Sequence, residues 1–412
     1  MEQLGGAHGV LDDVAVAEFV SSRFASLDLD GRSLCLVIPD ATRQCPLPLL
    51  LDTILRAVEG RVRSCRAVVA LGTHAPLGES DLRRLVGGDR LDVVNHEWWD
   101  ESTYVHLGEL SAADVARWSE GRLVESVPIR VNRHVVEADV TVIISPVLPH
   151  EVIGFSGGHK YLFPGLSGPE LIDVTHWLGA LITSSAIIGT PGITPVRALV
   201  EAAADLVPGE RHALCLVVAQ GSGAVEHLAF GETRAAWEAS VRVAARTHVE
   251  YLDAPVRRVV SLVSERYDEL WTGAKGFYKV EPVVADGGEV VLYAPHIAEI
   301  ARTHPGLERI GYHCRDYFLA HWDEVRHLPR GELAHSTHLF GAGTYDPVAG
   351  EHARVRVTLA TAIPEATTRA VNLGYADPAS LDLDTFESDP DTLVVHDAGE
   401  VLYRLRRPDR PR

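Results

Sequence analysis

The stretch from His150 to His176 carries the residue types best suited to chemistry in this 412-residue chain. It follows an apolar, β-branched run, Val140–Ile144, which predicts a buried strand. A Gly-Phe-Ser-Gly-Gly turn at 154–158 lets the backbone approach a ligand, because glycine tolerates positive φ. Successive N–H groups in such a turn suit an anion, usually a phosphate. Lys160 follows, where its amine could hold that anion or form a covalent bond.

Simpler interpretations of this stretch remain open. A glycine-rich turn after a strand is often only a turn, and a single lysine beside it is usually solvated. Lys160 is not preceded by Gly and followed by Ser or Thr, so the stretch is not a Walker loop. It also lacks the G-x-G-x-x-G spacing of a dinucleotide-binding fold.

Two earlier predicted strands also end in polar side chains. Leu34–Ile38 runs into Asp40 and Arg43, and Arg66–Leu71 runs into His74. Strand–loop–helix units in succession predict an α/β fold with parallel sheets, in which ligands bind beyond the carboxyl ends of the strands. We therefore expect these side chains to lie near the glycine-rich loop.

Later strands at 213–218, 258–263 and 289–294 repeat this pattern, with a helix expected to run up to Val284 before the last of them. A chain of this length exceeds one ordinary core. We predict two α/β domains, 1–268 and 269–412, with the active site in the cleft between them.

The composition excludes some classes of partner. A formal net charge of −19 argues against nucleic acid and anionic membranes. Five scattered cysteines without a C-x-x-C pair indicate a reducing compartment. The N-terminus lacks the basic and apolar regions of a signal peptide, and no stretch is typical of a spanning helix. A cytoplasmic protein without membrane partners is the expectation.

The residues at the strand exits favour acid–base chemistry on a carboxylate. The planar fork of Arg43 pairs bidentately with such a group, although a surface arginine beside an aspartate is more often an exposed ion pair. His74 is either a proton carrier or a hydrogen-bonded structural group. Lys275 lies in a turn before a predicted helix, which is typical of an exposed side chain.

Taken together, these pieces resemble the lactate racemase family, whose members carry a nickel-pincer nucleotide. The matching residues are Asp40-Ala-Thr-Arg43, Gly72-Thr73-His74, the His150-x-x-x-Gly-Phe-Ser-Gly-Gly-x-Lys160-x-x-x-Pro-Gly165 segment, His176 and Lys275. The likeness extends from about residue 34 to the Asn-Leu-Gly-Tyr segment at 372–375.

The resemblance implies a cofactor and its ligands. Lys160 would be joined covalently to the nucleotide through a thioamide. His176 would complete a square-planar nickel site, a geometry that suits Ni(II). The backbone of Phe155, Ser156, Gly157 and Gly158 would cradle the cofactor phosphate.

It also implies an isomerase that racemises or epimerises a 2-hydroxy acid through a 2-keto acid, by reversible hydride transfer from Cα to the cofactor. His74 and His150 would be the acid–base pair on opposite substrate faces. Arg43 and Lys275 would bind the substrate carboxylate, and Asp40 would orient His74 or the cofactor. Cofactor-synthesis proteins would be transient partners, and the oligomeric state stays open.

Some residues depart from the pattern expected of a lactate enzyme. Thr272 takes a substrate-binding position where a glutamine is common, His159 stands where an arginine is common, and Ala75 follows the histidine. A larger 2-hydroxy acid or a sugar acid is therefore a plausible substrate. His335 and His338 are spaced for metal binding, but no third ligand is evident, which favours a structural or a solvated pair.

Two other functions are compatible with the same residues. A zinc-dependent hydrolase would use His74, His150 and His176, but would leave Lys160 and the glycine-rich turn without a role. A non-catalytic homologue without cofactor would act as a binding protein. Metal analysis separates the three hypotheses.

Overall fold

The computed structural model describes residues 1–72 and 74–406, and the chain divides into two compact units. Each unit contains parallel strands joined through helices, so the predicted α/β class is confirmed. The first unit takes in residues 1–148, 155–175 and 191–247. The second takes in residues 149–154 and 176–190 and everything from 248 onward.

The first unit is built on a sheet that, within the described residues, has seven strands in the order β1-β11-β10-β7-β2-β3-β4. The five strands from β10 to β4 run parallel, while β11 and β1 are antiparallel. The bounds are β1 Glu2–Gly5, β2 Ser33–Ile38, β3 Ser64–Val69, β4 Asp92–Asn95, β7 Val140–Pro146, β10 Glu210–Val218 and β11 Val225–Gly231. The strand order reverses between β2 and β7, and open α/β sheets bind ligands at such a reversal.

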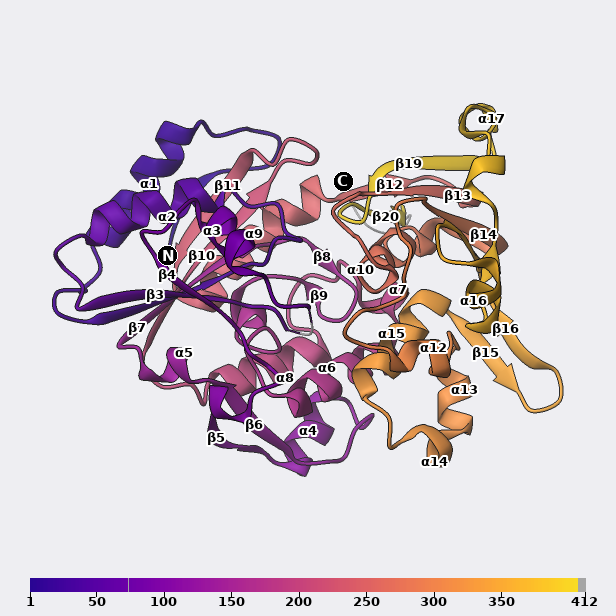
Figure 1. Cartoon of the computed structure of the whole chain (residues 1–412), viewed down its shortest axis with the longest axis horizontal. Helices are drawn as coiled ribbons and strands as arrows, with labels where there is room; N and C mark the ends of the chain where they lie inside the picture. Colours follow the sequence, from indigo (N-terminus) through magenta and orange to yellow (C-terminus); the bar gives the residue numbers. More distant parts are fainter. Residues whose placement is uncertain (73, 407–412) are drawn as a thin grey trace. The chain divides into compact units, whose positions relative to one another are not determined.

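Helices pack on this sheet, and a β-ribbon belongs to the same unit. In Figure 1, α1 and α2 lie together beside it, and their apolar faces share one core cluster with the strands. α1 begins where the Asp12 carboxylate accepts a hydrogen bond from the Ala15 N–H, and α3 ends at Gly87 in a left-handed conformation. The helices are α1 Asp13–Ala25, α2 Leu47–Val58, α3 Glu79–Val86, α4 Ala112–Trp118, α5 Arg133–Glu137, α8 Pro195–Ala204 and α9 Thr233–Thr247. The short helices are η1 Glu101–Thr103 and η2 Gly158–Tyr161, and the ribbon pairs β5 Tyr104–Leu110 with β6 Val127–Asn132.

The second unit has, among the described residues, a five-stranded parallel sheet in the order β18-β17-β14-β13-β19. Its strands are β13 Val256–Val263, β14 Val284–Ala294, β17 Arg356–Thr361, β18 Gly374–Tyr375 and β19 Thr392–Ala398. Two smaller ladders pair β12 Val249–Leu252 with β20 Leu402–Leu405, and β15 Gly343–Asp346 with β16 Gly350–Ala353.

The helices of the second unit are short and follow the sheet strands. They are α7 Ser184–Ile187, α10 Leu270–Gly273, α11 Lys275–Tyr278, α12 Gly306–Ile310, α13 Arg315–Ala320, α14 Trp322–Val325, α15 Arg330–Phe340, α16 Glu365–Ala370 and α17 Leu383–Ser388, with η3 Glu281–Val283 and η4 Pro378–Ser380. α6 Pro169–Ile182 begins in the first unit and ends in the second, and β8 Pro149–His150 and β9 Gly154–Phe155 lie where the chain passes between units.

Two predicted boundaries differ from the structure. The units do not coincide with 1–268 and 269–412, because β13 pairs with β14 and β19 and so belongs to the second sheet. The helix expected up to Val284 is wrong, since the chain makes the short turns α10, α11 and η3 and then enters β14 at Val284. Both errors concern pairing between segments distant in sequence, which local periodicity does not report.

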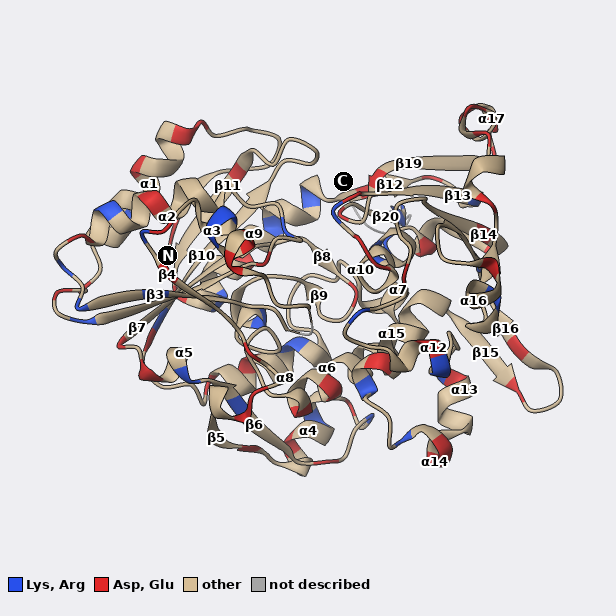
Figure 2. Cartoon of the chain, viewed as in Figure 1, with Lys and Arg blue, Asp and Glu red and all other residues tan. Residues whose placement is uncertain are grey.

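Charged residues lie mainly on helices and loops, and β7 carries none (Figure 2). The five cysteines are free thiols. Across residues 1–72 and 74–406, no helix is long and apolar enough to cross a membrane.

Candidate active site

In the first unit, Asp40 and His74 form a carboxylate–imidazole pair. Asp40 follows β2 and is 6% exposed, and His74 follows the adjacent strand β3. The His74 Nδ1 atom hydrogen-bonds the Asp40 Oδ2 atom, while the Thr42 N–H and hydroxyl donate to Oδ1 at 3.1 and 2.6 Å. The sequence-predicted pair is therefore assembled at the carboxyl ends of neighbouring parallel strands. Thr73, the middle residue of the predicted Gly-Thr-His piece, lies outside the described residues.

The surroundings of Asp40 favour its ionised form. Burial raises the pKa of this carboxyl, but the charge and hydrogen bond of His74, together with Arg43 and Thr42, outweigh burial and hold the pKa below its ordinary value. Asp40 is thus a permanent acceptor at neutral pH. A carboxylate in this position fixes the ring of His74 and stabilises its protonated form.

The lysine turn lies beside these two strand exits. The Gly72 N–H donates to the Gly165 carbonyl at 2.9 Å, which ties the β3 exit to the end of the turn. Arg43 interacts electrostatically with Tyr161, the neighbour of Lys160 in η2. Glycine is required at 157, where φ is 86° and a Cβ would stand 2.6 Å from the Val147 Cγ2 atom.

The expected nest of N–H groups is only partly present. The Ser156 N–H donates to the Leu148 carbonyl at 2.8 Å, and the Gly158 N–H donates to the Ser145 hydroxyl at 3.1 Å. Both groups are used inside the protein and do not point to a phosphate. The phosphate-cradling role of residues 155–158 stays a prediction, and these two N–H groups have acceptors within the protein because the loop is folded back on Ser145 and Leu148.

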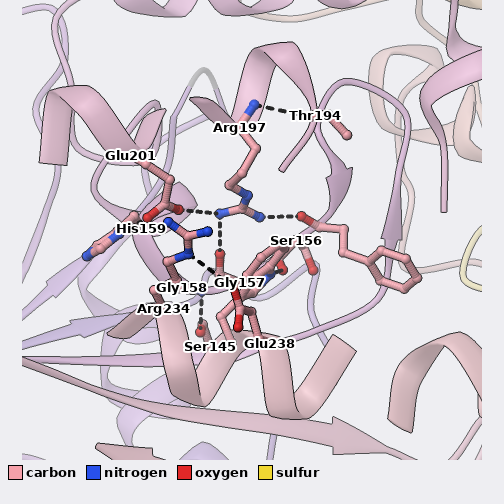
Figure 3. Close-up of polar contacts among 12 residues, drawn as sticks. Ser145, Ser156, Gly157, Gly158, His159, Thr194, Arg197, Glu201, Arg234 and Glu238 are labelled. Carbon is pink, nitrogen blue, oxygen red and sulfur yellow. Dashed lines mark hydrogen bonds and ion pairs between the residues drawn. The ribbon is translucent and has the colours of Figure 1, made fainter. Parts of the chain in front are cut away.

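A buried arginine that the sequence reasoning missed holds this loop. Arg197 on α8 is completely buried and donates to the Phe155 carbonyl at 2.5 Å and to the Gly157 carbonyl at 3.1 Å. Figure 3 shows its guanidinium group directed at the loop, with Glu201 on the same helix paired to it at 3.7 Å. Its carbon Cζ lies 4.0 Å from the ring centre of Trp237.

Trp237 and His159 complete the support of the loop. The indole N–H of Trp237, on α9, donates to the Ser156 carbonyl at 2.8 Å. His159, inside the lysine turn, is buried with its Nδ1 atom 2.8 Å from the Glu201 carboxylate. Side chains from α8 and α9 therefore fix the backbone on which Lys160 is mounted.

The second unit contains His150 and a carboxylate that the sequence reasoning also missed. The side chain of Glu151 is 12% exposed, and its Oε2 atom lies 3.5 Å from His150 Nδ1. Burial raises the pKa of Glu151, but His150, Lys275 and His338 outweigh burial and hold it well below its ordinary value. Glu151 is thus an ionised carboxylate at neutral pH, with the ammonium group of Lys275 and two imidazoles as its electrostatic partners.

The expectation that Lys275 is exposed is wrong. It is 5% exposed, interacts with Glu151 and places its ammonium nitrogen 5.4 Å from the ring centre of Tyr267. Thr272, on α10, is buried and donates its hydroxyl to the Glu269 carbonyl at 3.2 Å. The ammonium group of Lys275 is therefore next to a carboxylate, and the Thr272 hydroxyl already donates to an acceptor within the protein.

His176 lies on the part of α6 that belongs to the second unit, where it interacts electrostatically with His338. His335 and His338 are buried in α15: His335 stacks on Trp271, with ring centres 4.2 Å apart, and donates to its carbonyl. Among the described residues, no group of three or more His, Cys, Asp or Glu is arranged to hold a metal ion. The structural role predicted for the α15 pair agrees with these contacts.

Comparisons with known proteins identify the family. The model of the lactate racemase N-terminal domain matches residues 15–189. Lactate racemases of Thermoanaerobacterium thermosaccharolyticum and Lactiplantibacillus plantarum are each 26% identical over 163 and 161 residues, which is 38% of this chain and 35% of each relative. The match thus spans about a third of the curated relatives' length.

Solved structures extend the likeness to the whole chain. A Thermotoga maritima protein superposes with a TM-score of 0.91 at 32% identity, covering 98% of this chain and 100% of that one. The lactate racemase apoprotein of T. thermosaccharolyticum superposes with a TM-score of 0.71 at 18% identity, covering 97% and 95%, and shares the fold. These findings define an α/β protein that carries the lactate racemase N-terminal domain over residues 15–189. They support a relationship of the chain to the lactate racemase family.

Proposed function

We propose that this chain is a racemase or epimerase of a 2-hydroxy acid that works with a covalently bound nickel-pincer nucleotide. The observation that carries the proposal is the Asp40–His74 pair beside the loop that presents Lys160. An oriented imidazole next to a mounted amine is suited to proton transfer beside a tethered cofactor. The family likeness supplies the reaction class.

Lys160 and His176 have the chemistry that such a cofactor requires. A lysine amine forms amide-type bonds, and the rigid glycine turn under Arg197 holds the chain from which that amine extends. His176 supplies an imidazole of the kind that binds nickel. When bound, the nucleotide supplies a reversible acceptor for the hydride of the substrate Cα.

The protein's own residues handle the proton and the charge. His74 Nε2 accepts the α-hydroxyl proton while Asp40 stabilises the imidazolium that forms. His150 serves the enantiomer whose hydroxyl group lies on the other side. Lys275 and Arg43 bind the substrate carboxylate, Lys275 as a buried point charge and Arg43 through its planar fork. The substrate is a 2-hydroxy acid larger than lactate, or a sugar acid, since Thr272 replaces a longer amide side chain.

The test is co-expression of the chain with a nickel-pincer nucleotide synthesis pathway, followed by mass spectrometry and a screen of single-enantiomer 2-hydroxy acids. We expect an adduct on Lys160 and loss of optical activity with at least one acid. The chain contains three lysines, at 160, 275 and 279, so peptide mapping localises the adduct without ambiguity. Lys279 donates to the Glu400 carbonyl at 2.8 Å and is the matched structural lysine.

Two results would overturn the proposal. An adduct that persists in Lys160→Ala would place the attachment elsewhere, and near-normal racemisation by His74→Ala or His150→Ala would remove that histidine from the proton-carrier role. Metal analysis tests the rival functions at the same time. Nickel with the adduct agrees with a racemase, zinc alone with a hydrolase, and neither metal nor adduct with a cofactor-free binding protein.

A further inference from the structure

The two candidate acid–base histidines differ in the partner of their Nδ1 atoms. His74 faces Asp40, and a carboxylate held in its ionised form only accepts hydrogen bonds. The hydrogen of the neutral ring must therefore lie on Nδ1. The lone pair of neutral His74 is then on Nε2, where it can accept a proton.

His150 is arranged in the opposite way. The backbone N–H of Val152 donates to His150 Nδ1 at 3.2 Å. A backbone N–H only donates, so Nδ1 must carry the lone pair and the hydrogen of the neutral ring must lie on Nε2. In this state His150 presents an N–H, and not a lone pair, at the outer nitrogen of the ring.

Glu151 is placed to reverse that arrangement. Its carboxylate oxygen lies 3.5 Å from the same Nδ1 atom, a distance too long for a hydrogen bond to the neutral ring. When His150 is protonated, Nδ1 gains a hydrogen, loses the Val152 contact and acquires Glu151 as its acceptor. Lys275 and His338 also interact with Glu151 and keep it ionised.

We propose that the two histidines rest in opposite neutral tautomers, His74 as Nδ1–H and His150 as Nε2–H, and that Glu151 is the positioning residue that switches His150 between them. This inference rests on the proposed function for its role in turnover, although the tautomers themselves are properties of the free protein. It makes His74 the resting base. It makes His150 a hydrogen-bond donor until it is protonated.

The proton balance explains why Glu151 is needed. When the substrate O–H bond breaks at His74, the proton forms a new N–H bond at Nε2 and the positive charge is matched by Asp40. For the opposite hand, His150 first takes a proton from solvent water at Nδ1, and the imidazolium then gives its Nε2 proton to the substrate oxygen and becomes the neutral Nδ1–H form. Exchange of a proton with solvent returns it to the resting Nε2–H form. Val152 cannot accept from that form, whereas Glu151 can. Glu151 therefore supplies an acceptor for the Nδ1–H group in this half of the cycle.

The tautomers can be measured without turnover. The full chain, labelled with 15N-histidine and free of cofactor, is studied by two-bond 15N–1H NMR, and signals are assigned by their loss in His74→Gln and His150→Gln. We expect the Nδ1–H pattern for His74 and the Nε2–H pattern for His150 at a pH where both rings are neutral. The same tautomer in both rings, or Nδ1–H in His150, would overturn the inference whatever the racemisation assay shows.

Variants test the role of Glu151. In Glu151→Gln the neutral tautomer of His150 should be unchanged, while racemisation by the cofactor-loaded enzyme falls by roughly 100-fold and Glu151→Asp restores part of it. Glu201→Gln is the matched control, because Glu201 pairs with Nδ1 of a different histidine, His159. It should alter neither the His74 nor the His150 signals. Full activity of Glu151→Gln would show that the carboxylate is not required.

Discussion

The buried guanidinium of Arg197 gives the sharpest test of how the lysine loop is held. Arg197→Met keeps a side chain of similar length against Trp237 but removes the donors to the Phe155 and Gly157 carbonyls. Burial lowers the pKa of Arg197 to about 10, although Glu201 opposes this, so the native charge itself carries a desolvation cost.

The size of the expected destabilisation follows from the Phe155 and Gly157 carbonyls, which Arg197→Met leaves without a donor. Each buried carbonyl without a partner costs about 1–3 kcal/mol, and the relieved desolvation of the charge offsets part of the sum. We expect the loop to open more easily by about 3 kcal/mol, which corresponds to roughly 100-fold faster hydrogen exchange. The reporting amides are Ser156 and Gly158, because their N–H groups are hydrogen-bonded only while the loop is folded back on Leu148 and Ser145.

The assay is hydrogen exchange read by mass spectrometry with fragmentation to single amides. Arg234→Met is the matched control: Arg234 lies on α9 near the same loop but makes an exposed ion pair with Glu238 at 3.0 Å, whose loss is worth about 0.5 kcal/mol or less (Figure 3). Acceleration of less than about fivefold at both amides in Arg197→Met, or an equal effect in the control, would show that other contacts hold the loop.

Three further substitutions test the packing around the site. Burial lowers the pKa of His96 to about 4, so below about pH 6.5 the folded state binds fewer protons than the unfolded state and stability falls as the pH drops. In His96→Gln the melting temperature should depend less on pH between pH 6.5 and 4. An unchanged slope of melting temperature against pH would contradict this. Gly157→Ala places a Cβ atom 2.6 Å from the Val147 Cγ2 atom at a φ of 86°, and should lower the free energy of unfolding by about 1–3 kcal/mol in thermal unfolding. An unchanged free energy of unfolding would mean that the turn relaxes to accommodate the methyl group. Trp237→Phe removes the N–H donor to the Ser156 carbonyl and should destabilise the folded loop by about 1 kcal/mol, which gives roughly fivefold faster hydrogen exchange of the loop amides. An unchanged exchange rate would show that Arg197 holds the loop without Trp237.

The sequence predicted the parts of the site that follow directly from strand exits. Asp40 and His74 leave the neighbouring parallel strands β2 and β3, and their pairing follows from that topology. The glycine turn after β7 was likewise predicted, because Gly154, Gly157 and Gly158 tolerate the positive φ angles that they adopt in it. Hydrophobic periodicity and turn-forming residues act over a few neighbouring positions, so these features can be predicted from short segments of the sequence.

Glu151 could not be predicted in the same way. Beside His150 in a loop it has the pattern of an ordinary solvated acid, and its burial depends on Lys275 and His338, which are distant in sequence. Domain boundaries failed for the same reason: the place of β13 is set by its pairing with β14 and β19. Contacts between remote segments leave no periodic trace in the chain.

Arg197, by contrast, left a signal that was overlooked. It begins a helical face with the buried residues Val200 and Ala204, three and seven positions further on, and an arginine in line with apolar residues is expected to be buried. Burying a guanidinium requires acceptors that the helix itself cannot provide. The neighbouring glycine turn has carbonyl groups that can serve, and those of residues 155 and 157 do so.

Lysine usage gives a second signal that applies to the whole chain. Of 38 basic residues only three are lysines, so arginine is used almost wherever a positive charge is enough. A guanidinium stays protonated and cannot act as an amine, whereas a lysine can lose its proton and form a covalent bond. Lys279 is explained by its hydrogen bond to a buried carbonyl and Lys275 by its interaction with Glu151. The turn that carries Lys160 is held by Arg197 and Trp237, which fits the proposed use of its amine in a covalent bond.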